Sequence, residues 1–508
     1  MGSRIVDPDG LTAAGIREGA LAGRSVTVLG LARSGIAMAR FFSDVGACVT
    51  VYDGRAAGQL GPAIESLGSR AVELRLGPDV DPASTWDSAD LVATSPSINP
   101  DFPTAEPRLR QALAALVAAH RADPAGAPAL VSEPDLVLRL CPCPTIGVTG
   151  TKGKTTTSSL IAALLATDPA HPVVLGGNIG VPLVERLTEL SPENRVVIEL
   201  SELQLPTLSR GTTVAVYTNV TSDHLDRHGS LEAYRTVKRR LAELVDPKGM
   251  LVLNADDQIV AGYAIGATVP VVTYTRGRPA PAGLGVEDGW IVARGVAPDP
   301  RSNGRIMPIA ELKIPGEHNV SNAMAAISVA VLFEIPIGAI RQAAAAFTGV
   351  DNRLEPVGLV DGVRFINDSQ GTQPDAVVAA LRAFPRPLVL IAGGRDKGVD
   401  LSGLGPVAAE RADAAILIGE SGPALAALFT ASGMARVEQV PTLAAAVDRA
   451  DAIARDLLAA GSGAGAPATV LLSPAAASFD MFVDYADRGR AFRDAVGALA
   501  RRRSAGSE

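Results

Sequence analysis

One stretch of nine residues contains the residue types that proteins use to bind phosphate. The sequence TGTKGKTTT, residues 149–157, holds two glycines, two lysines and five threonines directly after the apolar run PTIGV. A glycine-rich turn between a strand and a helix exposes backbone N–H groups, and the helix start adds about half a positive charge. We therefore expect a nucleotide phosphate site in which Lys154 reaches the outer phosphates and the Thr155 hydroxyl ligates magnesium.

The match to the common phosphate-loop pattern is incomplete, because Val148 stands where that pattern has its first glycine. An ordinary glycine-rich turn is therefore the alternative. Glu199 favours the nucleotide site, since it ends the apolar run RVVIEL and a carboxylate at the end of a neighbouring strand can bind the cation that accompanies ATP. His224 follows the run VAVYTNV and is expected at the same sheet edge, and Lys238 lies in the helical stretch LEAYRTVKRRLAEL.

Each of these residues also has a purely structural explanation. Glu199 could cap a helix or be solvated, a histidine between acids is more often a surface residue, and a lysine on an amphipathic helix usually faces water. A nucleotide-dependent switch without catalysis would retain Lys154 but would not need Lys238 or His224. Because both are present, the sequence favours an enzyme.

The apolar runs around these residues predict three successive α/β series. The first contains SVTVLG and ACVTVYDGR, the second runs from TIGVTG to MLVLNADD, and the third contains VRFINDSQGT, PLVLIAGGRDKG, AAILIGE and ATVLLSPAAASFDMF. We predict an α/β protein of three domains: a Rossmann-like domain at residues 1–132, a central P-loop-type ATPase domain with a mainly parallel sheet at 133–349, and a Rossmann-like domain at 350–508. Residues 276–305, rich in proline, glycine and arginine, are predicted to be a surface excursion.

Composition and charge argue against several other classes of protein. The net charge of −8 leaves no basic footprint for nucleic acid. Cys141 and Cys143 are too close for an ordinary disulfide, and with Cys48 they lack the second pair that a zinc site needs. The first thirty residues do not resemble a signal peptide, and no run approaches eighteen apolar residues. We expect a cytoplasmic protein with no membrane insertion.

The first α/β series has a rival interpretation as a dinucleotide-binding fold. The turn after SVTVLG and the acid Asp53 at the end of the next strand resemble that fold, but Ala32 occupies the position of the middle glycine. An oxidoreductase would also leave the central phosphate-binding motifs unexplained. We therefore consider this class much less favoured.

Several motifs together resemble the Mur ligases of peptidoglycan synthesis, in order and spacing: TGTKGKTTT, GGNIG, ELSELQL, NVTSDHLDRH followed by YRTVK, NADD, GEHNVSNAMAA and DNRLE. Within that family NDSQGTQPDA, GGRDKG, LLSPAAASFDMF and LGLARSG are most similar to the branch that adds D-glutamate to UDP-N-acetylmuramoyl-L-alanine. The resemblance implies an ATP-dependent amide ligase, acting through an acyl phosphate, that is cytoplasmic and monomeric. The alternative is another Mur ligase, or a ligase similar to folylpolyglutamate synthase, with a different amino-acid specificity.

The resemblance also implies roles for individual residues. The catalytic residues would be Lys154, Glu199, His224 and Lys238. Two magnesium ions would be held by Thr155, Glu199, His224 and a carbamate formed from CO2 on Lys238. ATP would contact Gly150, Thr151, Lys152, Gly153, Lys154, Thr155, Thr156, Asn319, Asn322, Arg353 and Asp368. The UDP-linked substrate would contact Gly30, Leu31, Ala32, Arg33, Ser34, Asp53, Arg55, Ser95 and Asn178. D-glutamate would contact Thr372, Lys397, Ser473 and Phe482.

Four positions depart from the family pattern. Gln370 stands where the members that add glutamate commonly have a lysine, so one positive charge near the glutamate pocket is missing unless Arg395 replaces it. Glu202 and Leu203 replace the usual Ser-Phe pair, and Ser97 replaces a glycine. These departures leave the amino-acid specificity open and do not affect the predicted ATP chemistry.

Overall fold

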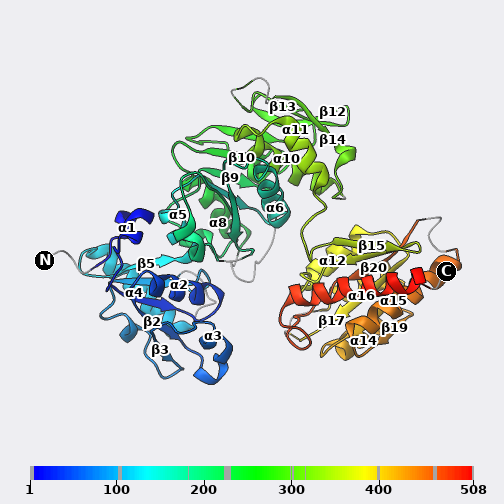
Figure 1. The fold of residues 1–508 in the computed structure, drawn as a ribbon, viewed down its shortest axis with the longest axis horizontal. Helices are drawn as coiled ribbons and strands as arrows, with labels where there is room; N and C mark the ends of the chain where they lie inside the picture. The colour runs from blue at the N-terminus through cyan, green and yellow to red at the C-terminus, as the bar shows by residue number, and fades with distance from the viewer. Residues whose placement is uncertain are drawn as a thin grey trace. The chain divides into compact units, whose positions relative to one another are not determined.

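The computed structural model describes residues 5–100, 106–180, 182–221, 230–297, 299, 303–314, 316–396, 401–461 and 466–505. The chain forms two compact units, Met1–Phe347 and Thr348–Glu508, and each is described here by itself (Figure 1). The first unit contains two β-sheets and the second contains one. All three sheets are flanked by helices, so the predicted α/β class with Rossmann-like outer sheets is confirmed.

The first sheet has five parallel strands in the order β3-β2-β1-β4-β5. Its central strand β1, SVTVL, is buried from Val26 to Leu29, as expected for a strand that is covered on both faces. The strands are β1 (Ser25–Leu29), β2 (Cys48–Asp53), β3 (Val72–Leu76), β4 (Leu91–Thr94) and β5 (Ala129–Ser132). The helices are α1 (Ala13–Arg17), α2 (Arg33–Asp44), α3 (Gly61–Glu65), α4 (Pro107–Ala122) and α5 (Glu133–Leu140).

The second sheet has nine strands in the order β14-β13-β12-β11-β10-β9-β6-β8-β7. It is parallel from β7 to β12. These strands are β6 (Thr145–Thr149), β7 (Val173–Gly177), β8 (Arg195–Glu199), β9 (Val214–Tyr217), β10 (Met250–Asn254), β11 (Val271–Tyr274) and β12 (Gly283–Glu287). The helices are α6 (Lys154–Leu165), α8 (Leu231–Leu244), α9 (Gln258–Gly262), α10 (Glu317–Leu332) and α11 (Ile337–Ala346).

The prediction of a surface excursion at residues 276–305 is wrong. This segment contains β12, all of β13 (Trp290–Arg294) and the start of β14 (Gly304–Pro308). Strand β12 pairs parallel with β11, and β13 and β14 then extend the sheet in antiparallel fashion. Asp288 and Gly289 both have positive φ, 50° and 77°, as the two central residues of a type I′ hairpin do. The pair Asp288-Gly289 was therefore the sequence signal for a hairpin. The many other glycines and prolines of the segment made it difficult to recognise.

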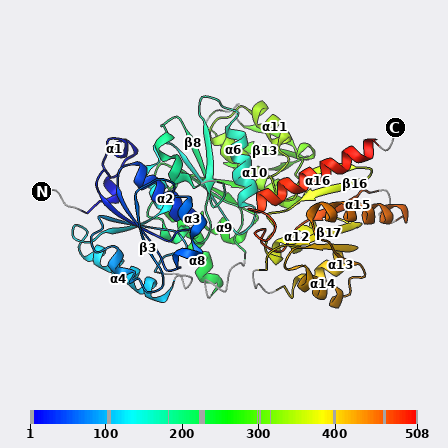
Figure 2. The ribbon, with the colours of Figure 1, turned by 60° about the horizontal axis from the view of Figure 1, so that its bottom comes forward.

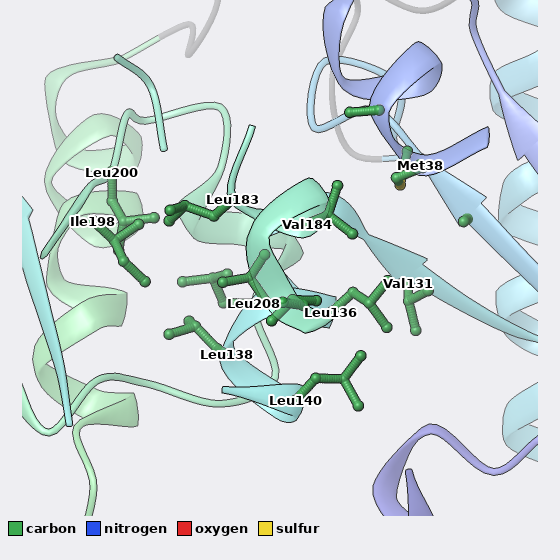
Figure 3. Close-up of a cluster of buried hydrophobic side chains, with 14 of the residues drawn as sticks. Met38, Val131, Leu136, Leu138, Leu140, Leu183, Val184, Ile198, Leu200 and Leu208 are labelled. Carbon is green, nitrogen blue, oxygen red and sulfur yellow. The ribbon is translucent and has the colours of Figure 1, made fainter. Parts of the chain in front are cut away.

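The two sheets of the first unit share one hydrophobic core. Figure 3 shows part of it, where Met38 of α2 and Val131 of β5 lie near side chains of α5 and of the 3-10 helix η4 (Leu183–Glu189). The same cluster reaches Ile198 of β8, in the second sheet. Continuous burial of this kind opposes movement of one sheet relative to the other, because any gap would expose apolar area at about 25 cal/mol per Å².

The second unit is a six-stranded sheet in the order β15-β16-β20-β17-β18-β19. Only the β15–β16 pair is antiparallel. Separate apolar cores cover its two faces, and in both Figure 1 and Figure 2 helices α15 and α16 lie side by side. The strands are β15 (Glu355–Val360), β16 (Val363–Asn367), β17 (Leu388–Gly393), β18 (Ala414–Ile418), β19 (Val437–Gln439) and β20 (Ala468–Leu472). The helices are α12 (Pro374–Ala383), α13 (Leu404–Arg411), α14 (Gly422–Ala431), α15 (Leu443–Ala459) and α16 (Tyr485–Ala505).

The described residues contain no helix whose length and apolar character would allow it to cross a lipid bilayer.

Arg488 of α16 is fully buried and ties together two loops of the second unit. Its guanidinium donates to the carbonyls of Ser369 at 2.9 Å, Ala476 at 3.1 Å and Ala477 at 3.2 Å. Burial lowers the pKa of Arg488 to about 10, against the opposing charges of Asp480 and Asp368. The side chain therefore remains charged at neutral pH and serves as a hydrogen-bond donor inside the fold.

We expect Arg488→Met to destabilise the second unit by about 2–4 kcal/mol, because the carbonyls of Ser369 and Ala476 lose the guanidinium donor and the carbonyl of Ala477 retains only the N–H of Arg395. Urea unfolding followed with hydrogen exchange of peptides around Ser369 and Ala476 measures the change. Arg488→Lys, which retains a donor, should lose less. An unchanged urea midpoint for the methionine variant would contradict this role.

Candidate active site

The predicted phosphate loop lies at the carboxyl end of β6, in the interior of the nine-stranded sheet. Gly153 is the N-cap of α6 with φ 87°, and Gly150 has φ 151°. A Cβ on Gly150 would stand 2.0 Å from Oγ1 of Thr218. Both positions therefore require glycine, one for its backbone conformation and the other also for space.

The end of the neighbouring strand β9 holds this loop in place. Asn219 accepts from the backbone N–H of Thr151 through its carbonyl at 2.8 Å and from that of Lys152 through its side-chain oxygen at 3.0 Å. The Asn219 amide and the Thr218 hydroxyl both donate to the carbonyl of Lys152, at 2.9 Å and 2.6 Å. The sequence analysis missed Asn219, although a polar residue directly after a buried strand was an available signal.

Two lysine ammonium groups converge on one carbonyl of the loop. Lys154 donates to the carbonyls of Gly150 at 2.9 Å and Thr151 at 2.8 Å. Lys238 donates to the carbonyl of Gly150 at 3.0 Å and to Oγ1 of Thr149 at 3.3 Å. Lys238 is 0% exposed, so the alternative of a solvent-facing lysine is wrong.

Tyr234 lies one helical turn before Lys238 on the same face of α8. Its hydroxyl lies 2.9 Å from Oγ1 of Thr151, and its ring centre lies 5.6 Å from the Lys238 ammonium. Helix α8 therefore contributes two side chains to the phosphate loop, of which the sequence analysis identified one.

Glu199 at the end of β8 has the properties expected of a cation ligand. Its side chain is 2% exposed, and Oε1 accepts from the Asn178 amide at 2.9 Å. Oε2 is buried and has no hydrogen-bond partner among the residues that the structure describes. A buried carboxylate oxygen without a partner is costly, and a bound cation would remove that cost. The donor chemistry thus fits magnesium.

The remaining residues of the predicted metal and phosphate site are only partly described. Thr155 is buried in the first turn of α6, and Thr156 follows it. His224 lies outside the described residues. A cluster of three or more acidic, histidine or cysteine side chains suited to a metal does not occur in the described parts of the chain.

Helix α10 lies beside the phosphate loop although the two are far apart in the sequence. A Cβ on Gly153 would stand 2.4 Å from Oδ1 of Asn322, which places that side chain against the loop. The Asn322 amide donates to Oδ1 of Asn319 at 3.0 Å. The structure therefore brings both asparagines, predicted for ATP, to the phosphate loop.

The turn after β1 is built around Asp53. Leu31 donates its backbone N–H to Asp53 at 2.8 Å, and the Arg55 guanidinium donates to both carboxylate oxygens at 2.9 Å and 2.7 Å. Burial acts to raise the pKa of Asp53, but the hydrogen bonds from Arg55 and Leu31 outweigh it and hold the pKa below its ordinary value. Gly30 has φ 86°, and Ala32 is the N-cap of α2.

A cavity of about 160 Å³ lies beside this turn, and we call it the Arg33 cavity. It brings together four of the residues predicted for the UDP-linked substrate, from three separate segments: Arg33, Ser34, Ser95 and Asn178. The Arg33 guanidinium also donates to the carbonyl of Gly180. The other lining residues are Pro96, Ser97, Glu133, Gly177, Pro182, Ser201, Leu203 and Gln204, of which the sequence analysis had noted only Ser97 and Leu203, as departures from the family pattern.

In the second unit, Asp368 and Ser473 share a hydrogen bond. The Ser473 hydroxyl donates to Asp368 at 2.7 Å, and the backbone N–H of Leu354 donates to it at 3.2 Å. Burial raises the pKa of Asp368 to about 6, against these hydrogen bonds and the charges of Arg353 and Arg488. Residues predicted for ATP and for D-glutamate thus meet within one unit.

The other residues predicted for this unit are placed as follows. Thr372 donates its N–H to the carbonyl of Gln370 at 2.8 Å, and Phe482 donates its N–H to the carbonyl of Ser478 at 2.9 Å. The side-chain oxygen of Gln370 is buried without a hydrogen-bond partner. Lys397 lies outside the described residues.

The geometry and fold define a phosphate-loop α/β protein with Rossmann-like flanking sheets. The family model for the Mur ligase middle domain matches residues 148–330, and that for the Mur ligase glutamate ligase domain matches residues 352–476. A UDP-N-acetylmuramoylalanine–D-glutamate ligase of Symbiobacterium thermophilum is 38% identical over 93% of this chain and 98% of its own length. The protein of the same name from Pelotomaculum thermopropionicum is 35% identical over 94% and 98%.

The chain belongs to the Mur ligase family, and it is an ATP-dependent ligase. Among solved structures, the UDP-N-acetylmuramate-alanine ligase of Thermotoga maritima matches with a TM-score of 0.52 and 18% identity, over 94% of this chain and 99% of that one. This likeness concerns the fold alone.

The pKa of Asp368 leads to a test of stability against pH. Because its folded pKa lies above the ordinary value of 3.8, its favourable contribution is complete below that value and is lost as the pH rises through about 6. The ionised form then costs at most about 3 kcal/mol, from about 1.4 kcal/mol per pKa unit. We expect Asp368→Asn to raise the melting temperature of the second unit at pH 8 and not at pH 4, while ATP binding weakens. Thermal scans at both pH values and ATP titration measure this, and an equal change at both pH values would contradict it.

Proposed function

We propose that this protein joins D-glutamate to UDP-N-acetylmuramoyl-L-alanine, using ATP, in the synthesis of peptidoglycan precursors. The observation that carries this proposal is similarity over almost the whole chain to relatives named for D-glutamate. The match to the glutamate ligase domain model at residues 352–476 supports it independently of the central domain. The cytoplasmic location and the monomeric state remain predictions.

The reaction needs an activated carboxyl group. A carboxylate repels an incoming nucleophile, so we propose that the carboxylate of the UDP-linked substrate first attacks the γ-phosphate of ATP. ADP leaves, and the carboxylate becomes an acyl phosphate. The amine of D-glutamate then attacks the carbonyl carbon, and the tetrahedral intermediate collapses to an amide and free phosphate. Enzymes accelerate phosphoryl transfer mainly by positioning and by compensating charge.

The phosphate loop supplies the positioning. The backbone N–H groups at the start of α6 and the ammonium of Lys154 would bind the outer phosphates, with Lys154 exchanging the carbonyl of Gly150 for phosphate oxygens. Asn319 and Asn322 of α10 would contact the nucleotide. Asn178, which donates to Glu199, would hold the UDP-linked substrate beside the same loop.

Magnesium held by Thr155, Glu199, His224 and modified Lys238 would neutralise charge on the β- and γ-phosphates. The unpartnered Oε2 of Glu199 supports this donor set. Two ammonium groups on one carbonyl repel each other, and carbamylation of Lys238 removes that repulsion. In that step the deprotonated amine forms an N–C bond with CO2 and releases a proton, which leaves an anionic oxygen donor.

We expect Lys238→Ala to lower turnover by at least about a hundredfold, because the variant removes an oxygen donor that would hold the charge-compensating magnesium. Short carboxylic acids should restore part of the activity by replacing the carbamate. Phosphate release with saturating substrates measures both effects. Lys248→Ala changes an exposed lysine of the same unit and serves as the control. A fully active Lys238→Ala enzyme would refute the carbamate role.

An amino acid other than D-glutamate is the second candidate for the substrate. Gln370 replaces the lysine that is common in the family, which removes a positive charge, and its buried side-chain oxygen has no hydrogen-bond partner among the described residues. We expect D-glutamate to be preferred by at least about tenfold in kcat/KM, which corresponds to about 1.4 kcal/mol of differential transition-state binding. A panel of D- and L-amino acids with UDP-N-acetylmuramoyl-L-alanine and ATP tests this. Preference for another amino acid would overturn the D-glutamate assignment and leave the ligase assignment in place.

A further inference from the structure

Glu133 is a buried acid in the wall of the Arg33 cavity to which the proposed mechanism gives no role. It is the first residue of α5 and is 3% exposed. The backbone N–H of Val184 donates to its Oε1 at 3.4 Å, which is a long contact. An ion pair to Glu133 does not occur in the described part of the chain. The carboxyl is thus removed from water with little compensation.

The charged groups on the surrounding elements are mostly engaged elsewhere. Arg33 of α2 donates to the carbonyl of Gly180. Glu185 of η4 pairs with Arg40 of α2 at 3.1 Å, and Asp135 of α5 pairs with Arg139 at 2.8 Å. Glu202 lies on the loop after β8, two residues before Gln204 of the cavity wall. Of these groups, only Arg33 favours the ionised form of Glu133.

Apart from Glu133, the residues that line the cavity are suited to binding an anionic ligand. It offers the guanidinium of Arg33, the hydroxyls of Ser34 and Ser95, and the amide of Asn178. The first turn of the twelve-residue helix α2 adds backbone N–H groups and a partial positive charge. A carboxylate in the same wall would repel a diphosphate, whereas a neutral carboxyl could donate a hydrogen bond to it.

We propose that Glu133 takes up a proton from solvent when the diphosphate of the UDP-linked substrate enters the Arg33 cavity, and that the neutral carboxyl then donates to a ligand oxygen. One O–H bond forms on the carboxylate, and no other bond changes. This inference rests on the proposed function. Burial raises the pKa of Glu133 to about 7, although the charge of Arg33 and the N–H groups of Val184 and Leu183 act to lower it. Proton uptake therefore requires little free energy near neutral pH.

Isothermal titration calorimetry of the full-length protein with UDP-N-acetylmuramoyl-L-alanine tests this. Measurements at pH 7 and pH 8, each in two buffers of different ionisation enthalpy, give the number of protons exchanged. From a free pKa of about 7, we expect uptake of about 0.5 proton at pH 7 and about 0.9 at pH 8, with Kd rising about fivefold between them. The diphosphate is doubly esterified and has no group that titrates in this range.

Glu133→Gln retains an acceptor for Val184 and removes the titration. We expect this variant to bind UDP-N-acetylmuramoyl-L-alanine without proton uptake and with the same Kd at pH 7 and pH 8. Glu185→Gln, which removes a nearby carboxylate outside the cavity, should behave as wild type. Should Glu133→Gln fail to fold, infrared difference spectra of the wild type at pH 8 must show a protonated carboxyl appearing on nucleotide addition.

The outcomes separate the two proposals. The role of Glu133 would be overturned if wild type and Glu133→Gln took up equal numbers of protons on binding UDP-N-acetylmuramoyl-L-alanine. An infrared difference spectrum without a new carboxyl band would overturn it as well. Either result would leave the ligase function intact. A wild-type protein that does not bind UDP-N-acetylmuramoyl-L-alanine would overturn the proposed function, and this inference with it.

Discussion

The chemistry of the first unit depends on how the carbonyl of Gly150 is held. Two ammonium groups donate to this oxygen, and the side chain of Thr218 leaves no room for a Cβ on the same residue. Asn219 fixes the next two backbone N–H groups through its own carbonyl and side chain. The backbone of the loop is therefore fixed before any phosphate arrives, and on the proposed mechanism the side chains of Lys154 and Lys238 are the groups that change partners.

Several buried polar groups in the candidate sites lack the partners that a stable interior normally provides. Glu199 has one unpartnered oxygen, Glu133 has only weak backbone contacts, and Gln370 has an unpartnered oxygen in the second unit. Each such group costs stability when the protein stands alone. On the proposed mechanism each would gain a partner from a ligand, namely a cation, an anion with a proton, or an amino acid. The folded protein thus gives up some stability where it must recognise charged substrates.

The location of the Arg33 cavity follows from the core that the two sheets of the first unit share. Apolar side chains of α2, α5 and η4 form one cluster that also contains residues of β8 (Figure 3). The polar ends of these same elements line the cavity, so Arg33 and Asn178, which come from separate segments, lie in its wall together. The second unit has its own two cores, and Asp368 and Ser473 meet without help from the first unit.

The sequence alone determined the class of fold and the chemistry of the phosphate loop, because both depend on local patterns. Apolar runs that end in polar residues predict parallel strands, and a glycine-rich turn followed by Lys154 and Thr155 predicts phosphate binding through its own backbone. Only the tertiary structure decided that Lys238 faces inward, that Asn219 holds the loop, and that Glu133 lines the Arg33 cavity. These facts depend on which segments meet in space. Burial of a charge and the lack of a partner are properties of such meetings, and no spacing along the chain encodes them.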